Sequence, residues 1–568
     1  MTEYERWLNE PLDDPDLTQE LQAVKDQPEE INDRFYQDLA FGTGGLRGVI
    51  GAGTNRINIY TVRKATQGLA NYLKKHADAP SVAIAYDSRI KSDTFAKAAA
   101  EVLAANGIHA HIYPELMPTP ALSYAVRHLK CDAGINITAS HNPAKYNGYK
   151  AYGSDGCQVA SEMADAILHE INSLDIFADV KHTDYDKAQA AGLIHTIPAE
   201  VTEAFLSAVQ KESIIDCEGT DFSVVYTPLN GAGRRCVTQI LDRIGIKNVT
   251  LVPEQTEPDG NFTTCPYPNP EIREALQKGL DLCETVKPDL LLATDPDCDR
   301  VGIAVRDAKS GEYELLTGNE VGVLLLDFIA KNRKEQGTLP KNPVTIKTIV
   351  STDLTDLVAQ DYGIELKSVL TGFKYIGEQI AALEKKGEEN RYIFGFEESY
   401  GYLSGTYVRD KDAVNASMLI CEMAVYYKRQ GLTLVDALHN LYAKHGYFLN
   451  ALMNFAFEGE SGMLQMKSIM DTLRNNPPVA FGDFKISGWS DYANSVRYDG
   501  TDSSVIDLPK SNVLEYRLDN GSKVIVRPSG TEPKIKIYLS GKGVDKTASQ
   551  GIIEKLKQAA PKVLGIDD

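Results

Sequence analysis

The sequence has few cysteines, and no two of them stand at a metal-binding or redox spacing. Eight cysteines are spread over 568 residues, and none forms a CxxC pair. This distribution is typical neither of a disulfide framework nor of a zinc site. We therefore expect all eight to be reduced thiols.

The chain also lacks long apolar runs and an excess of basic residues. It opens MTEYERWLNE, without a cationic and apolar leader, and no apolar run approaches the roughly 18 residues that span a membrane. Lys and Arg number 59 against 79 Asp and Glu, which gives a formal net charge of −20. This balance disfavours nucleic-acid and membrane partners, although a local basic pocket for a phosphorylated small molecule is compatible with it. We expect a cytoplasmic protein.

The composition is that of an ordinary globular protein, with 43% hydrophobic and 24% charged residues. At about 150 residues per domain, the length suggests about four domains. Three successive segments, starting near Ser81, Phe222 and Val344, alternate apolar strands with helical stretches. This alternation is typical of α/β domains with a mostly parallel sheet, and the period-2 strands and Lys-rich terminal helix beyond residue 450 predict an α+β domain. We predict three related α/β domains at 1–205, 206–325 and 326–445, and an α+β domain at 446–568.

The segment CDAGINITASHNPAKYNGYK, Cys131 to Lys150, places a serine directly after a predicted strand. Ser140 then lies at the carboxyl end of that strand, where open α/β sheets bind their ligands. A serine hydroxyl needs a basic or cationic neighbour, or a metal, to exchange an acyl or phosphoryl group. His141 and Lys150 are candidates. The alternative is a surface turn rich in Ser, Asn and Pro.

The segment DPDCDR brings three carboxylates together. Asp295, Asp297 and Asp299 project from one face if the segment is extended, and three like charges so close are costly unless a cation lies among them. A calcium EF-hand does not fit, because Arg300 stands where that loop requires Gly. An oxygen-only site suits Mg²⁺. The alternative is a solvated acidic turn.

Two further loops have the composition of phosphate sites. FGTGGLRG, Phe41 to Gly48, has glycines that permit close backbone approach, and Arg47 offers a planar fork suited to a phosphate. RPSGTEPK, Arg527 to Lys534, has backbone N–H groups that can form an anion nest, with hydrogen bonds added by Arg527, Ser529 and Thr531. The alternatives are a flexible connector and a plain hairpin turn.

GFEESYG, residues 395–401, combines Glu397 and Glu398 with Ser399 at a strand end. Such acceptors suit neighbouring sugar hydroxyls, although paired glutamates are also a helix-start signal. TGFKYIG supplies Lys374 at another strand end, where it is either a ligand contact or an exposed structural lysine.

TASHNP, DPDCDR, GFEES and RPSGTEP occur in this order, one in each predicted domain. Through them the chain resembles the α-D-phosphohexomutases along nearly its whole length. FGTGGLRG, TGFKYIG and GFEESYG make it most similar to the phosphoglucomutase branch. The resemblance implies four domains around a central cleft.

The resemblance also implies roles for individual residues. Ser140 would be a phosphoserine, and Mg²⁺ would be held by Asp295, Asp297, Asp299 and a phosphate oxygen on Ser140. Lys150 matches the lysine proposed as general acid or base in this family. The residues around the transferring phosphate would be Arg47, His141, Lys150 and Arg300. The other substrate contacts would be Thr371, Gly372, Lys374, Glu397, Ser399, Arg527, Ser529, Gly530 and Thr531.

The implied reaction interconverts glucose 1-phosphate and glucose 6-phosphate. The phosphoserine phosphorylates the hexose phosphate to a 1,6-bisphosphate, which turns over and returns its other phosphate. Glucose 1,6-bisphosphate would then also act as an activator. Phosphomannomutase, phosphopentomutase and glucose-1,6-bisphosphate synthase activities remain open, as do a phosphatase, a non-catalytic sugar-phosphate sensor, and a monomer or a dimer.

Overall fold

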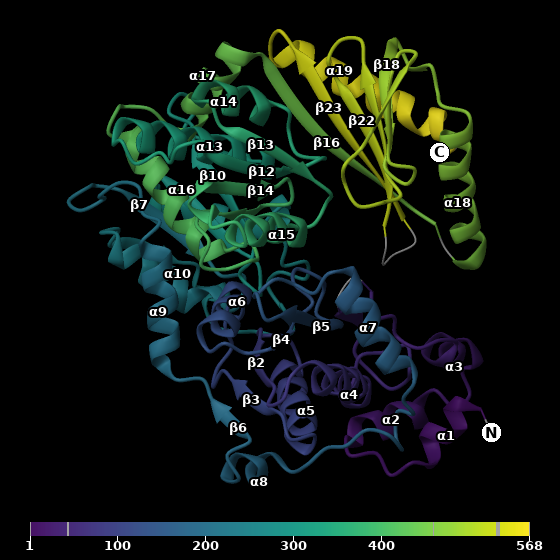
Figure 1. Cartoon of the computed structure of the whole chain (residues 1–568). Helices are drawn as coiled ribbons and strands as arrows, with labels where there is room; N and C mark the ends of the chain where they lie inside the picture. The colour runs from purple at the N-terminus through teal and green to yellow at the C-terminus, as the bar shows by residue number, and fades with distance from the viewer. Residues whose placement is uncertain (1, 43–44, 458, 530–533, 567–568) are drawn as a thin grey trace.

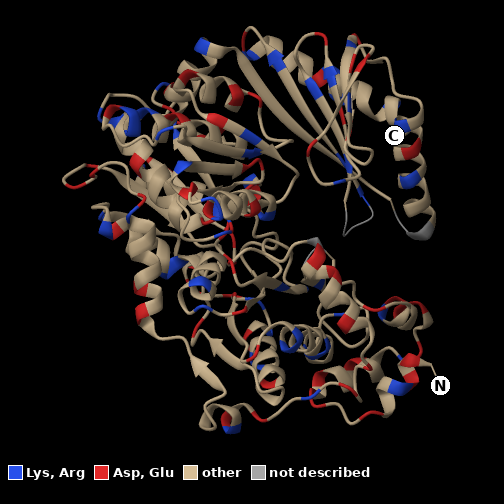
Figure 2. Ribbon diagram, viewed as in Figure 1, with Lys and Arg blue, Asp and Glu red and all other residues tan. Residues whose placement is uncertain are grey.

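The computed structural model describes the chain except residues 1, 43–44, 458, 530–533 and 567–568. Four sheets follow one another along it, and we call the parts of the chain that carry them the first to fourth units. In Figure 1 the yellow strands of the fourth unit lie at the upper right, beside the green third unit and across from the purple first unit. Acidic and basic residues are spread over all four units (Figure 2).

The first three sheets share one plan. The first has the order β1-β5-β4-β2-β3-β6, the second β11-β10-β9-β7-β8 and the third β13-β12-β14-β15. Their strands are β1 Gly45–Val49, β2 Ser81–Tyr86, β3 His109–Ile112, β4 Ala133–Ile137, β5 Tyr146–Gly153, β6 Ile194–Thr196, β7 Ser223–Thr227, β8 Asn248–Leu251, β9 Leu290–Thr294, β10 Val301–Arg306, β11 Tyr313–Leu316, β12 Val344–Thr348, β13 Glu365–Val369, β14 Tyr392–Glu397 and β15 Gly401–Leu403.

Within each of these sheets, three parallel neighbours are followed by an antiparallel strand. The parallel sets are β3-β2-β4, β8-β7-β9 and β13-β12-β14, and the antiparallel strands are β5, β10 and β15. The loop that joins the last parallel strand to the antiparallel one is therefore equivalent in all three units. These loops carry Ser140, the three aspartates and Ser399.

Parallel strands that are covered on both faces are expected to be apolar along their whole length. β9, LLLAT, is buried at every position, and so is β4, AGINI.

Helices cover the faces of these sheets. In the first three units these are α4 Ile59–His76, α5 Ser92–Ala105, α6 Thr119–His128, α7 Ser161–Asn172, α8 Tyr185–Ala190, α9 Ala199–Gln210, α10 Gly233–Arg243, α11 Pro253–Thr256, α12 Arg273–Val286, α13 Gly318–Glu335, α14 Leu354–Tyr362, α15 Phe373–Glu384, the 3₁₀ turn Glu389–Arg391, α16 Ala413–Lys428 and α17 Leu434–His445.

The first 40 residues form three short helices, α1 Glu3–Asn9, α2 Pro15–Ala23 and α3 Pro28–Phe35. Each of the last two has proline in its first turn, where the missing N–H is not needed. Trp7 is fully buried, with edge contacts to the rings of Tyr60 and Phe177. This segment therefore packs onto the first unit.

The fourth unit is an antiparallel sheet in the order β16-β23-β22-β21-β18-β19-β20, with β17 paired to β18. Its elements are β16 Tyr447–Ala456, β17 Ala480–Phe481, β18 Phe484–Asp491, β19 Val496–Asp499, β20 Asp502–Val505, β21 Leu514–Leu518, β22 Lys523–Pro528, β23 Lys534–Gly543, α18 Gly459–Asn475 and α19 Lys546–Leu564. It contacts the third unit through an apolar cluster that includes Ile349, Leu370 and Tyr538. The predicted class, three α/β parts and a C-terminal α+β part, is confirmed.

None of the helices described has both the length and the apolar character needed to span a bilayer.

Candidate active site

Ser140 follows β4 in a left-handed conformation, with φ of 53°. Its side chain is almost wholly enclosed. Its Oγ donates a hydrogen bond to Asp295 Oδ2 at 3.1 Å and lies 3.2 Å from His141 Nδ1. The backbone N–H of Ser140 donates to Thr138 Oγ1 at 2.8 Å. The predicted serine and the first predicted aspartate, 155 residues apart, thus meet directly.

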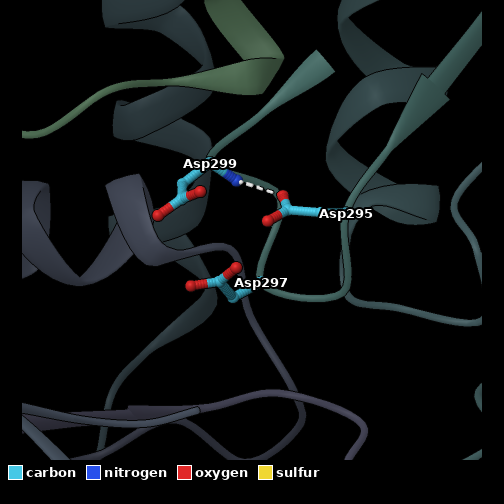
Figure 3. A group of neighbouring side chains, drawn as sticks. All are labelled: Asp295, Asp297 and Asp299. Carbon is cyan, nitrogen blue, oxygen red and sulfur yellow. Dashed lines mark hydrogen bonds between the residues drawn. The ribbon is translucent and has the colours of Figure 1, made fainter. Parts of the chain in front are cut away.

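The three aspartates lie on the turn between β9 and β10, with ligand oxygens within 4.8 Å of one another (Figure 3). The sequence predicts the three aspartates on one face of an extended segment, but this segment is a turn and is not extended. Cys298 adopts a left-handed φ of 52°, and the turn closes through Asp295 Oδ1, which accepts the N–H of Asp299 at 3.0 Å and of Arg300 at 2.9 Å. The turn, and not strand alternation, brings the carboxylates together.

The donor set fits an oxygen-seeking cation. Asp297 Oδ1 and both carboxylate oxygens of Asp299 are buried and have no hydrogen-bond partner in the part of the chain that the structure describes. Burial, and then the other two aspartates, raise the pKa of Asp295 well above its usual range. Buried carboxylates with unused oxygens are what a divalent cation such as Mg²⁺ would satisfy.

Asp297 is fixed by two neighbouring elements of the first unit. Its Oδ2 accepts hydrogen bonds from Lys150 Nζ on β5 and from Thr119 Oγ1 at the start of α6, both at 2.9 Å. Burial alone would raise the pKa of Asp297, but Lys150 holds it below its usual range. Lys150 Nζ is also 3.6 Å from Asp299 Oδ2. Burial lowers the pKa of Lys150, and these two carboxylates outweigh it, so the lysine is charged.

Lys411 is a second largely buried lysine at this cluster, with a side chain 12% exposed, and no sequence motif indicated it. Its Nζ is 3.1 Å from Asp299 Oδ2 and 3.8 Å from Glu397 Oε1. Asp299 and Asp410 raise its pKa against the effect of burial. The only sequence signal is RDKDA, a charged run that looks like an exposed turn.

His141 directly follows Ser140 in the sequence, and Arg300 directly follows Asp299. Burial, with Arg300 and Arg47 nearby, lowers the pKa of His141 well below its usual range, so its imidazole is neutral. The Arg300 guanidinium is ion-paired with Glu271, another residue that sequence motifs did not indicate. Arg47 lies on β1, and its Nη1 donates to Asn142 Oδ1 at 3.4 Å.

A cavity of about 1310 Å³ is lined by residues of all four units. The predicted residues that line it are His141, Arg300, Thr371, Gly372, Lys374, Glu397, Ser399, Arg527 and Ser529. Ser140, Lys150, Arg47 and the three aspartates are not among its lining residues, but Lys411 lines it and reaches Asp299. Gly530 and Thr531 lie outside the described residues.

The third unit contributes carboxylates and a lysine to the cavity. Burial raises the pKa of Glu397, and burial together with Glu397 raises the pKa of Glu398 to about 7. Glu398 Oε2 accepts a hydrogen bond from Thr348 Oγ1 at 3.0 Å. Lys374 stands in the first turn of α15, and burial lowers its pKa.

The fourth unit contributes basic residues. Arg527 on β22 lies directly opposite Lys536 on β23, and both line the cavity. Burial and the charges of Arg527 and Lys534 lower the pKa of Lys536. Like charges directly opposite each other on paired strands are destabilising, so this pair fits an anionic ligand. Lys536 was missed, although the period-2 run KIK places it on the same face as Lys534.

Comparison with known proteins agrees with this geometry. Residues 38–176, 203–311 and 317–445 match alpha/beta/alpha domains I, II and III of a family described as phosphoglucomutase/phosphomannomutase, and residues 453–551 match its C-terminal domain. The chain belongs to the phosphoglucomutase/phosphomannomutase family. The family matches occur in the order of the four units.

Two relatives within the family are similar over almost the full length. A phosphoglucomutase of Staphylococcus aureus strain USA300 is 39% identical over 525 residues, which cover 91% of this chain and 92% of that protein. The phosphoglucomutase of strain MRSA252 is also 39% identical, over 530 residues that cover 92% and 93%.

Solved structures of family members share the fold. A phosphomannomutase from Thermus thermophilus, named as putative, is similar with a TM-score of 0.68 at 22% identity, over 92% of this chain and 99% of that one. The phosphoglucomutase parafusin from Paramecium, in an open form, has a TM-score of 0.68 at 18% identity, over 94% and 95%. At these identities the similarity concerns the arrangement of the chain.

Proposed function

We propose that this family member is a phosphoglucomutase, which interconverts α-D-glucose 1-phosphate and glucose 6-phosphate through a phosphoserine and glucose 1,6-bisphosphate. The observation that carries the proposal is the contact of the Ser140 hydroxyl with Asp295, inside a cluster of three buried carboxylates. The long relatives named phosphoglucomutase support the choice of hexose.

Mg²⁺ would be held by Asp295, Asp297, Asp299 and a phosphate oxygen on Ser140. When bound, it neutralises charge on the oxygens of the transferring phosphoryl group. The protein's own residues provide the rest of the positive charge, from Arg47, Arg300 and Lys150. The neutral imidazole of His141 forms a hydrogen bond with Ser140 Oγ through Nδ1 and adds no charge.

In the transfer step a sugar hydroxyl attacks the phosphorus, and the bond from phosphorus to Ser140 Oγ breaks. The sugar hydroxyl loses a proton and Oγ gains one. Lys150 is charged and largely enclosed beside the cluster. It is therefore suited to donate a proton to Oγ and to regain one from the sugar hydroxyl.

The product of the first transfer has two phosphates, and only one can face Ser140 at a time. Arg527, Ser529 and Lys536 are suited to bind the other phosphate, together with the predicted Gly530 and Thr531. Glu397 and Ser399 are suited to the sugar hydroxyls, and Thr371, Gly372 and Lys374 to the substrate in both orientations. Free glucose 1,6-bisphosphate would activate the enzyme by phosphorylating Ser140.

The first test is the initial rate with Mg²⁺ and catalytic glucose 1,6-bisphosphate on glucose 1-phosphate, mannose 1-phosphate and ribose 1-phosphate, for the wild type and Ser140→Ala. We expect a marked preference for glucose 1-phosphate and at least about a 1,000-fold loss in the variant, since the phosphoryl carrier is removed. Preference for mannose or ribose would change the substrate but keep the roles. No turnover would favour a sensor.

We further propose domain bounds at 1–205, 206–325, 326–445 and 446–568, and a cytoplasmic location for this chain. Substrate competition separates the phosphomannomutase, phosphopentomutase and bisphosphate synthase alternatives.

A further inference from the structure

Arg89 is a buried arginine whose guanidinium binds the loop that carries Ser140. Its side chain is fully enclosed. Nη1 donates to the carbonyl oxygens of Pro143 at 3.1 Å and Tyr146 at 3.0 Å, and Nη2 donates to those of Ser140 and Asn142. One planar fork therefore holds four carbonyl groups of the loop between residues 140 and 146.

Asp87 ties this fork to the other side of the serine. Its Oδ2 is 3.3 Å from Arg89 Nε and accepts a hydrogen bond from Thr138 Oγ1 at 2.6 Å. Thr138 Oγ1 in turn accepts the N–H of Ser140. The N–H of Ser140 is thus held through Thr138 and its C=O through Arg89. Both peptide groups that flank the serine are fixed, and with them its left-handed φ and the position of the Cβ from which Oγ reaches Asp295.

A residue of the second unit covers the Arg89 guanidinium, which belongs to the first unit. The Phe262 ring lies over it, 5.0 Å from the guanidinium carbon, and the side chain is fully buried. Phe262 has a φ of 47°, which costs free energy in a bulky residue. A Cβ on the nearby Gly260 would come within 2.7 Å of Ile90 N and 2.9 Å of Ser88 O, so this turn lies directly on the backbone around Arg89.

We propose that Arg89, locked by Phe262, is a positioning residue for phosphoryl transfer. It touches no reacting atom and acts by fixing the serine backbone from which Oγ projects toward Asp295 and the substrate. The inference rests on the proposed function. Misplacing a reacting group by about 1 Å lowers rates up to about 100-fold, so a looser serine loop is expected to slow transfer while leaving substrate binding almost unchanged.

Arg89→Lys separates this role from general stabilisation. Lysine keeps the charge but presents its donors from a single nitrogen, so it cannot hold four carbonyl groups in the geometry of the fork. Arg56→Lys is a matched control. Arg56 is also a buried arginine of the first unit. It pairs with the Asp33 carboxylate and donates to the carbonyl oxygens of Asp33 and Asn55, and none of these groups belongs to the serine loop.

The experiment measures kcat and KM for glucose 1-phosphate, the melting temperature, and the fraction of enzyme with phosphoserine by intact mass. For Arg89→Lys we expect kcat per phosphorylated enzyme to fall about 10- to 100-fold, with KM changed less than about 3-fold. The rate of phosphoserine hydrolysis, relative to the rate of phosphoryl transfer to the sugar, should rise. Arg56→Lys should have a comparable melting temperature and a kcat close to that of the wild type.

Equal kcat values for Arg89→Lys and Arg56→Lys, after correction for phosphoserine content, would overturn the proposal. If Arg89→Lys does not fold, Phe262→Leu decides, because it removes only the ring over the guanidinium. For Phe262→Leu we expect kcat to be about 3- to 10-fold lower than in the wild type, and an unchanged kcat would overturn the proposal. A wild type without phosphoserine or turnover would instead refute the proposed function.

Discussion

At the scale of single residues, the site consists of buried carboxylates and lysines whose opposite charges stabilise one another. Asp299 has buried oxygens without hydrogen-bond partners among the described residues, yet two lysines lie within 4 Å of it. Burying three carboxylates in this way is costly unless cations share the space. The cluster is therefore less stable than a neutral core would be, and ready to bind a metal and a phosphate.

Lys411 provides the prediction at this scale. Lys411→Met removes a cation that lies beside Asp299 and lines the substrate cavity. We expect kcat/KM for glucose 1-phosphate to fall about 100-fold, since the cation that pairs with Asp299 at the edge of the substrate cavity is lost. We also expect tighter divalent-cation binding, because one positive charge no longer competes for the carboxylates.

The measurement combines initial rates with Mn²⁺ binding followed by electron paramagnetic resonance. Lys444→Met is the control, since that lysine is exposed and pairs with Asp361 far along the chain from the cluster. A Mn²⁺ affinity weaker in Lys411→Met than in the control would contradict the assignment.

At the scale of elements, α16 shows how a buried helix is tied to the chain around it. Its mid-helix Glu422 is fully buried, and its carboxylate accepts hydrogen bonds from the Ser213 hydroxyl and from the N–H groups of Ile214 and Ile215. These residues follow α9, so one carboxylate connects the third unit to the segment between the first and second. Burial raises the pKa of Glu422 to about 7.

This pKa predicts a pH dependence of stability. Between its usual value of 4.5 and about 7, folded Glu422 keeps a proton that the unfolded chain has released. The free energy of unfolding therefore falls as pH rises through this window, by about 3 kcal/mol at most. Glu422→Gln removes this term, because a glutamine amide can donate to Ser213 and accept from Ile214.

The stability of Glu422→Gln minus that of the wild type should thus grow from pH 4.5 to about 7 and then level off. Denaturant titrations at several pH values measure the difference. Glu335→Gln, an exposed position at the end of α13, is the control and should give a flat difference. A flat difference for Glu422→Gln as well would refute the raised pKa.

Elements were predictable where local signals agree. One example is α4, which starts at Ile59 because the side chain of Asn58 before it accepts hydrogen bonds from two backbone N–H groups. The turn of the aspartates was not predictable, since it depends on the left-handed Cys298. Lys411 and Glu271 were missed because only tertiary packing brings them to the site.

At the scale of the whole molecule, one cavity takes residues from every unit, among them His141 next to Ser140 and the basic residues Arg527 and Lys536 of the fourth unit. The bisphosphate must turn without leaving, and water must be kept from the phosphoserine. The fourth unit contacts the third through the apolar cluster around Tyr538 and through Lys523, which donates to Asp353 at 2.7 Å. Neither of these contacts involves the first unit.

We therefore predict that the fourth unit moves toward the first when sugar phosphate binds, because its basic residues gain an anion that both sides can share. Small-angle X-ray scattering with and without glucose 1,6-bisphosphate measures the change. The Ser140→Ala variant is used because it keeps the cavity but cannot take up the phosphoryl group. Its radius of gyration should decrease when glucose 1,6-bisphosphate binds, and by a similar amount with glucose 6-phosphate.

Arg527→Ala, which removes a basic residue of the fourth unit, should show a smaller decrease in the radius of gyration. Identical scattering of Ser140→Ala with and without ligand, at concentrations where calorimetry shows binding, would mean that the cavity is already closed as it stands. Exclusion of water would then have to come from the loops alone.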